Sequence, residues 1–126
     1  MEAANINKDA PRILIVDDVE ANRFILRDVI TEMGYRPILT ENGVQALKMV
    51  MHLRPQLIIL DIAMPEMDGY EVCTKIKENP DTREIPIIFI SAFDDPSDVV
   101  KGFSFGGEDY ITKPFIPEVV KARVNM

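Results

Sequence analysis

Five polar side chains in this sequence stand just after short apolar runs. They are Asp17, Asp18, Asp61, Ser91 and Lys113. A single Asp after a strand most often forms a turn or caps a helix. Five such groups at one edge of a sheet are much harder to explain by turn chemistry, so they are the first candidates for a functional site.

The residue types in this group favour metal-assisted phosphoryl chemistry. Three clustered carboxylates raise one another's pKa values unless a cation joins them. Because the available ligands are all oxygens, a hard divalent ion fits best, Mg²⁺ above all, with Mn²⁺ as a substitute. An open ion of this kind, the ammonium of Lys113 and the hydroxyl of Ser91 would each meet one phosphoryl oxygen. An Asp can act as the nucleophile that forms an acyl phosphate, and Asp61, on the middle strand, is the geometric choice.

The elements that would position these groups alternate between short apolar runs and longer segments of helical period. The runs are Ile13–Val16, Pro37–Leu39, Leu57–Leu60, Ile87–Ile90 and Tyr110–Ile111. The predicted helices lie between Ala21 and Gly34, Asn42 and Pro55, Gly69 and Asn79, Pro96 and Gly106, and Pro117 and Met126. Several of the runs are almost continuously apolar, as expected for strands that helices cover on both faces.

This alternation predicts an α/β fold of the flavodoxin-like type. Five βα units form a three-layer sandwich around a parallel five-stranded sheet, and the expected strand order is 2-1-3-4-5. In such sheets the functional crevice lies beyond the carboxyl ends of the strands. That is where the five polar groups fall.

Composition and length restrict the domain organisation and the partners. The chain has 126 residues, which is the size of one domain. Its net charge of -7 argues against direct binding to nucleic acid and to an anionic membrane surface. The single cysteine, Cys73, cannot form an internal disulfide, and we see no signal peptide or transmembrane segment, so a cytoplasmic protein is expected.

We expect residues 1–10 to be a flexible lead-in and residues 11–126 to form the folded domain. The last predicted helix has only about ten residues from Pro117. This suggests that the chain is part of a longer protein.

The sequence resembles the receiver domains of two-component response regulators over about residues 11–126. The matching stretches are ILIVDD (13–18), N-G-x-x-A-L (42–47), LIILDIAMPEMDG (57–69), IIFISA (87–92) and DYITKPF (109–115). Any one of them could occur by chance, but their order and spacing together are highly specific.

The resemblance implies a phosphoacceptor and a metal site. Asp61 matches the phosphorylated aspartate of the family. Asp18 matches a direct Mg²⁺ ligand, and Asp17 matches one that acts mainly through water. The backbone carbonyl of Ala63 would complete the protein's share of the coordination.

The resemblance also implies a set of phosphoryl-binding and switch residues. Ser91 matches the switch hydroxyl, and the backbone amide of Ala92 would also reach the phosphoryl group. Lys113 matches the lysine of the family, and Pro114 follows it in what is usually a cis peptide. Tyr110 falls at the aromatic switch position.

The expected partners follow from the same resemblance. A sensor histidine kinase or a phosphotransfer protein would supply the phosphoryl group. Phosphorylation would reshape the face formed by the fourth helix, the fifth strand and the fifth helix, and so control an output domain or a partner protein. A homodimer would use that same face. We expect only self-phosphorylation and self-dephosphorylation chemistry from the domain, which could be fused to an enzyme.

Three other functions remain to be weighed. A nucleotide-binding module of the same fold needs a glycine-rich or hydroxyl-rich first loop, whereas residues 17–20 carry three acids. A phosphatase of the haloacid-dehalogenase kind needs a second Asp two residues after Asp61, where Ala63 stands. A receiver-like scaffold that works without phosphorylation is the most serious rival. Such scaffolds typically lack an acid or the lysine, and this chain keeps them all.

Overall fold

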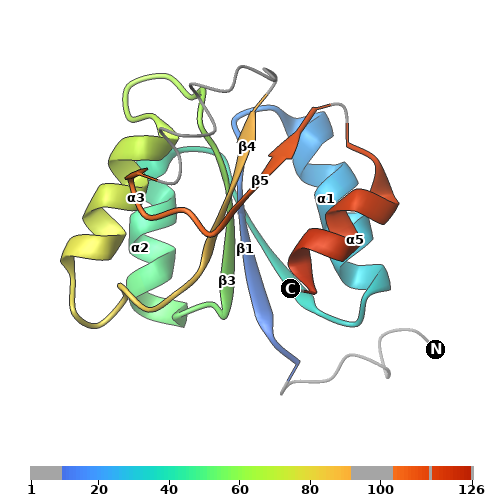
Figure 1. Cartoon of the computed structure of the whole chain (residues 1–126), viewed down its shortest axis with the longest axis horizontal. Coiled ribbons are helices and arrows are strands. Elements are labelled where there is room, and N and C mark those ends of the chain that lie inside the picture. Colours follow the sequence, from blue (N-terminus) through green and yellow to red (C-terminus); the bar gives the residue numbers. More distant parts are fainter. Residues whose placement is uncertain (1–9, 92–103, 114, 126) are drawn as a thin grey trace.

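The structure is a computed structural model that describes residues 10–91, 104–113 and 115–125 (Figure 1). Four predictions lie outside these residues: the flexible lead-in apart from its last residue, most of the fourth helix, and the roles of Ala92 and Pro114.

The predicted elements are present within the described residues. The strands are β1 (Arg12–Val16), β2 (Arg36–Thr40), β3 (Leu57–Asp61), β4 (Ile87–Ser91) and β5 (Asp109–Thr112). The helices are α1 (Glu20–Glu32), α2 (Gly43–Leu53), α3 (Gly69–Glu78) and α5 (Pro117–Val124). Strands β3 and β4 each extend one residue beyond the apolar run, so Asp61 and Ser91 end strands instead of following them. The last helix, predicted between Pro117 and Met126, is observed up to Val124, and Met126 lies outside the described residues.

The strands form one parallel sheet with the predicted order β2-β1-β3-β4-β5. Figure 1 shows α1 and α5 against one face of this sheet and α2 and α3 against the other. The three-layer architecture is therefore confirmed. No helix in the described part of the chain is both long enough and apolar enough to cross a membrane.

Two apolar clusters hold the sheet between its helical layers. Alternate side chains of a strand point to opposite faces, so Leu14 and Val16 join one cluster and Ile13 and Ile15 join the other. The same alternation divides the residues of β3. Burial on both faces explains why these runs are almost continuously apolar. Cys73 lies in the first cluster as a buried core residue.

Two helices begin with an acidic or amide cap followed by glycine. The side chain of Asn42 accepts a hydrogen bond from the backbone of Gln45 at the start of α2. That of Asp68 accepts one from the backbone of Glu71 at the start of α3. Asn and Asp are favoured at this position, and their side chains satisfy amides that would otherwise lack partners.

Glycine is needed after these caps for close packing, but the two positions differ in what surrounds them. A Cβ at Gly69 would overlap the carbonyl oxygen of Asp61 and come within 2.9 Å of the Cα of Ile62. The three atoms nearest to a Cβ at Gly43 all belong to side chains, with Val72 Cγ2 at 2.8 Å. Helix α3 therefore packs directly on the backbone of β3 at Asp61.

We expect Gly69→Ala to destabilise the protein by about 1–3 kcal/mol, because backbone atoms cannot move aside as side chains do. Gly43→Ala is the matched control, since it also follows a helix cap, and it should cost less. Denaturant unfolding of the two variants measures the difference. Equal losses for both variants would contradict the close approach of α3 to Asp61.

Candidate functional site

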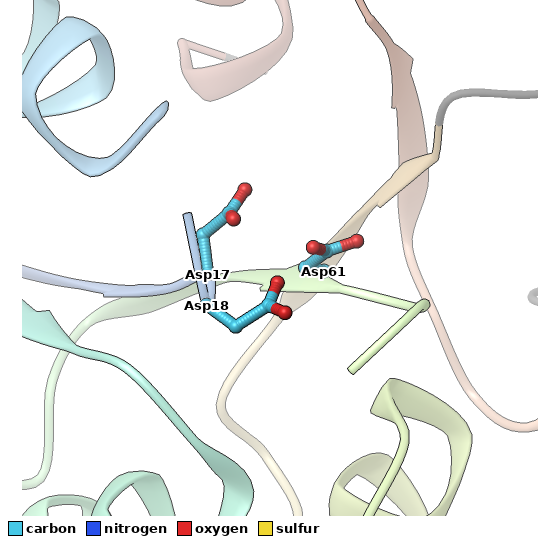
Figure 2. Close-up of side chains that lie close together, drawn as sticks. All are labelled: Asp17, Asp18 and Asp61. Atoms are coloured by element: carbon cyan, nitrogen blue, oxygen red, sulfur yellow. The ribbon is translucent and has the colours of Figure 1, made fainter. Parts of the chain in front are cut away.

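Three carboxylates converge at the carboxyl edge of the sheet. Asp17 and Asp18 follow β1, and Asp61 ends the neighbouring strand β3. One oxygen from each carboxylate lies within 4.8 Å of the others. Figure 2 shows the three side chains reaching into the same space. The predicted acidic cluster is thus formed by the fold.

Asp17 is fully buried and is fixed on several sides. Its Oδ1 accepts hydrogen bonds from the backbone N–H of Val19 at 2.9 Å and from Asn22 Nδ2 at 3.5 Å. Its own backbone N–H donates to the carbonyl of Thr40 at 3.2 Å. Among the described residues, Oδ2 of Asp17 has no hydrogen-bond donor. This buried oxygen has an ion pair with Lys113 and no hydrogen bond from a described residue.

The ammonium of Lys113 lies between the two buried carboxylates. Its Nζ is 3.3 Å from Oδ2 of Asp61 and 3.5 Å from Oδ2 of Asp17. The lysine side chain is 21% exposed, so water screens this contact only in part. The backbone N–H of Lys113 donates to the carbonyl of Ser91 at 2.8 Å, which ties the lysine to the end of β4.

Asp61 combines deep burial with a raised pKa. The residue is 1% exposed, and its Oδ1 accepts a hydrogen bond from the backbone N–H of Ala63 at 3.1 Å. Burial, and after it the charge of Asp17, raises the pKa of Asp61 from an ordinary 3.8 to about 6. Lys113 and the Ala63 amide lower the pKa but do not offset the rise. The single ammonium therefore leaves this group of carboxylates undercompensated.

These observations fit a hard divalent cation. The donors are carboxylate oxygens, one of them buried without a hydrogen-bond donor, and their charge exceeds that of Lys113. Ions such as Mg²⁺ prefer oxygen ligands of this kind and usually keep several waters. Asp17, Asp18 and Asp61 are the residues that could hold it.

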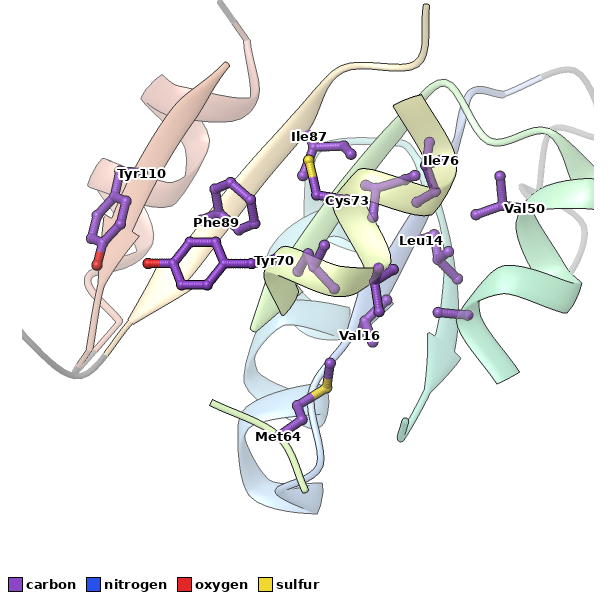
Figure 3. Packing of buried hydrophobic residues seen from close by; sticks show 14 residues of the cluster. Leu14, Val16, Val50, Met64, Tyr70, Cys73, Ile76, Ile87, Phe89 and Tyr110 are labelled. Atoms are coloured by element: carbon purple, nitrogen blue, oxygen red, sulfur yellow. The ribbon is translucent and has the colours of Figure 1, made fainter. Parts of the chain in front are cut away.

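The two predicted switch residues lie on the neighbouring strands β4 and β5. Ser91 is buried at the end of β4, and Tyr110 is buried in β5. Tyr110 pairs in register with Phe89 of β4. Figure 3 shows the rings of Tyr70, Phe89 and Tyr110 gathered at one end of the first apolar cluster. Ala63 is exposed beside Asp61, and the sites predicted for Ala92 and Pro114 lie outside the described residues.

One contact at this site was missed by the sequence analysis. Nη1 of Arg23 donates to the backbone carbonyl of Asp17 at 2.7 Å. Arg23 stands within the helical pattern of α1, where a charged side chain normally points to solvent. The one sequence signal for this contact is the spacing of six residues between Asp17 and Arg23. This spacing places Arg23 in the first turns of the helix that follows β1. His52, in contrast, is exposed on α2.

A family model for the response regulator receiver domain matches residues 13–125. The chain belongs to this family. This chain matches the response regulator PleD of Caulobacter vibrioides with 42% identity, over 90% of this chain and 25% of PleD. It matches the probable transcriptional regulator ycf27 of Cyanidium caldarium with 42% identity, over 94% of this chain and 47% of that protein. The chain thus spans between a quarter and a half of these relatives.

Solved structures agree with this assignment. The signal receiver domain of a histidine kinase from Syntrophus aciditrophicus superposes with a TM-score of 0.84 at 40% identity, covering 92% of this chain and 88% of that chain. The chemotaxis protein CheY4 of Vibrio cholerae superposes with a TM-score of 0.87 at 25% identity, covering 92% and 97%. Receiver domains in general accept a phosphoryl group on an aspartate and typically bind Mg²⁺ at an acidic cluster.

The raised pKa of Asp61 predicts a pH-dependent stability difference in metal-free protein. The folded state holds the Asp61 proton more tightly than the unfolded chain, so ionisation costs stability as the pH rises through about 6. Asp61→Asn stays neutral and should be more stable than the wild type by about 2 kcal/mol near pH 7.5. Below about pH 3 Asp61 is protonated in both the folded and the unfolded state, and this advantage should vanish. Urea unfolding in EDTA across this range measures it.

The matched control for this prediction is Asp28→Asn, which removes a carboxylate whose side chain is 71% exposed on α1. Its effect on stability should be small and nearly independent of pH. A constant difference between Asp61→Asn and wild type from pH 4 to 8 would show that Asp61 ionises normally in the folded protein.

Proposed function

We propose that this receiver domain takes a phosphoryl group from a phosphohistidine donor onto Asp61 in a reaction that depends on Mg²⁺. The observation that carries the proposal is the meeting of buried Asp61 with Asp17 and Lys113 at one edge of the sheet. In this arrangement a nucleophilic carboxylate stands beside a fixed cation and two further oxygen ligands. That is the positioning and charge neutralisation on which phosphoryl transfer depends.

In the proposed step an oxygen of Asp61 attacks the phosphorus atom as the bond from phosphorus to the donor imidazole nitrogen breaks. The products are an acyl phosphate on Asp61 and a free histidine on the donor. Lys113, already 3.3 Å from Oδ2 of Asp61, would compensate the charge of the transferred group. Bound Mg²⁺ would supply further charge neutralisation at the phosphoryl oxygens. Asp17 and Asp18 would hold this ion with Asp61 and with the backbone carbonyl of Ala63.

Ser91 and Tyr110 are the proposed switch residues. The hydroxyl of Ser91 would reach the phosphoryl group together with the amide of Ala92, and the ring of Tyr110 would respond to its movement. Support comes from the β4–β5 pairing, in which Lys113 is bonded to the carbonyl of Ser91 and Tyr110 pairs with Phe89. A local charge change could thereby bias a two-state element of the fold.

The partners follow from the family. Receiver domains interact with histidine kinases and with output domains. The proposed donor here is a sensor histidine kinase or a phosphotransfer protein. The proposed output is a domain or partner read through the face of the fourth helix, β5 and α5, which is also the proposed homodimer face. The cytoplasmic location stays a prediction from the sequence.

Intact-mass measurement after incubation with Mg²⁺ and acetyl phosphate or phosphoramidate tests the proposal. We expect one phosphoryl group per chain, because the small donors carry the same reactive phosphoryl centre as phosphohistidine. Asp61→Asn and an EDTA-treated sample should show no gain. Asp28→Asn, an exposed carboxylate on α1, serves as the matched control and should be phosphorylated like the wild type.

No mass gain with several donors, in protein shown to be folded, would favour the rival interaction scaffold. A gain that persists in Asp61→Asn would place the phosphoryl group on another residue. A gain that persists in EDTA would remove the metal from the proposal.

A further inference from the structure

We propose that Arg23 is a positioning residue that sets the geometry of the metal-binding carboxylates through the backbone of Asp17. This inference rests on the proposed function, because it concerns the same acidic site. Arg23 lies in α1, its side chain is only 12% exposed, and its Nη1 donates to the carbonyl oxygen of Asp17 at 2.7 Å. A short bond from a partly buried guanidinium to a carbonyl is among the stronger hydrogen bonds in proteins.

The bonded carbonyl belongs to the peptide that joins Asp17 to Asp18. A change in the ψ angle of Asp17 would turn this carbonyl and move the Cα of Asp18, and therefore its carboxylate. The side chain of Asp18 is exposed, so its place beside Asp17 and Asp61 depends on the backbone that carries it. On the other side of Asp17, its backbone N–H donates to Thr40. Arg23 thus completes the set of bonds that holds the chain through both ligands.

A second contact orients the guanidinium itself. Nη2 of Arg23 lies 3.9 Å from Oε2 of Glu41, which stands in the loop between β2 and α2. The Glu41 side chain is 58% exposed, so this ion pair contributes little energy by itself. The ion pair acts by restraining the orientation of the Arg23 guanidinium. The planar fork of an arginine can meet a carbonyl and a carboxylate at once, whereas a lysine offers one compact ammonium.

Positioning and simple charge predict opposite effects on metal binding. A cation beside three carboxylates weakens their attraction for a second cation, so removing its charge alone should tighten the binding of Mg²⁺. Loss of positioning should weaken the binding, because the ligands no longer hold their mutual geometry. Removing a partner that orients metal ligands typically costs about 10–100-fold in affinity. The sign of the change therefore separates the two roles.

The test is isothermal titration of Mg²⁺ into folded wild type, Arg23→Ala, Arg23→Lys and Arg27→Ala. Arg27 is the matched control, since it lies on the same helix, carries the same charge and pairs only with the exposed Asp28 among the described acids. We expect Arg23→Ala to weaken Mg²⁺ binding about 10-fold. Arg23→Lys should recover part of the loss, and Arg27→Ala should match the wild type or bind slightly more tightly. At saturating Mg²⁺, phosphorylation of Arg23→Ala should approach the wild-type rate.

Unchanged or tighter Mg²⁺ binding in folded Arg23→Ala would overturn the proposal, as would an equal loss in Arg27→Ala. Should Arg23→Ala not fold, Arg23→Gln decides the matter, because it keeps a donor without the charge. Its Mg²⁺ affinity should lie below that of the wild type, and wild-type or tighter affinity would overturn the proposal. A wild-type protein that binds no Mg²⁺ and takes no phosphoryl group would instead refute the proposed function.

Discussion

Two carboxylates, those of Asp17 and Asp61, are almost fully buried and approach the same ammonium group, that of Lys113. Burying a charge is costly unless a partner compensates it, and one cation cannot compensate two buried anions and the exposed Asp18 beside them. The raised pKa of Asp61 expresses this imbalance in the metal-free protein. A divalent cation that relieves it would bind to the folded state alone and would thereby stabilise the fold. The same excess of negative charge that attracts the ion would otherwise repel the incoming phosphoryl group.

The sheet order is what brings these charges together. Strand β1 neighbours β3, so Asp17 and Asp61 leave adjacent strands at the same edge, although they are far apart in sequence. Lys113 follows β5, two strands from β3, and its long side chain covers this separation. Its backbone is fixed by the bond to Ser91 at the end of β4. A different crossover order would separate the acids from the lysine, so the site depends on the topology as directly as on the residues.

Much of this arrangement could be predicted from residue types. Continuous apolar runs identify the buried strands, and the Asn42 and Asp68 caps mark helix starts, because each rests on a local preference. Functional groups of such sheets lie beyond the carboxyl ends of the strands. This rule predicts that Asp17, Asp61 and Lys113 lie together, without any knowledge of distances. The contact of Arg23 with a backbone carbonyl could not be predicted in this way, since it depends on how α1 packs over the end of β1. The left-handed backbone conformation of Glu66, with φ of 68°, could not be predicted either, because glutamate does not favour that conformation.

The two sides of the acidic cluster are held by backbone contacts of different kinds. On the β3 side, the close approach of Gly69 to the carbonyl of Asp61 leaves no room for a side chain, so packing fixes the end of this strand. On the β1 side, where Asp18 is exposed, packing cannot act in the same way, and the guanidinium of Arg23 supplies a hydrogen bond instead. Both devices act on backbone atoms and occupy none of the carboxylate oxygens of the three acids. This matters for the proposed function, because a restraint on the backbone does not compete with a metal ion for these oxygens, whereas a side-chain bond such as that from Asn22 to Oδ1 of Asp17 does.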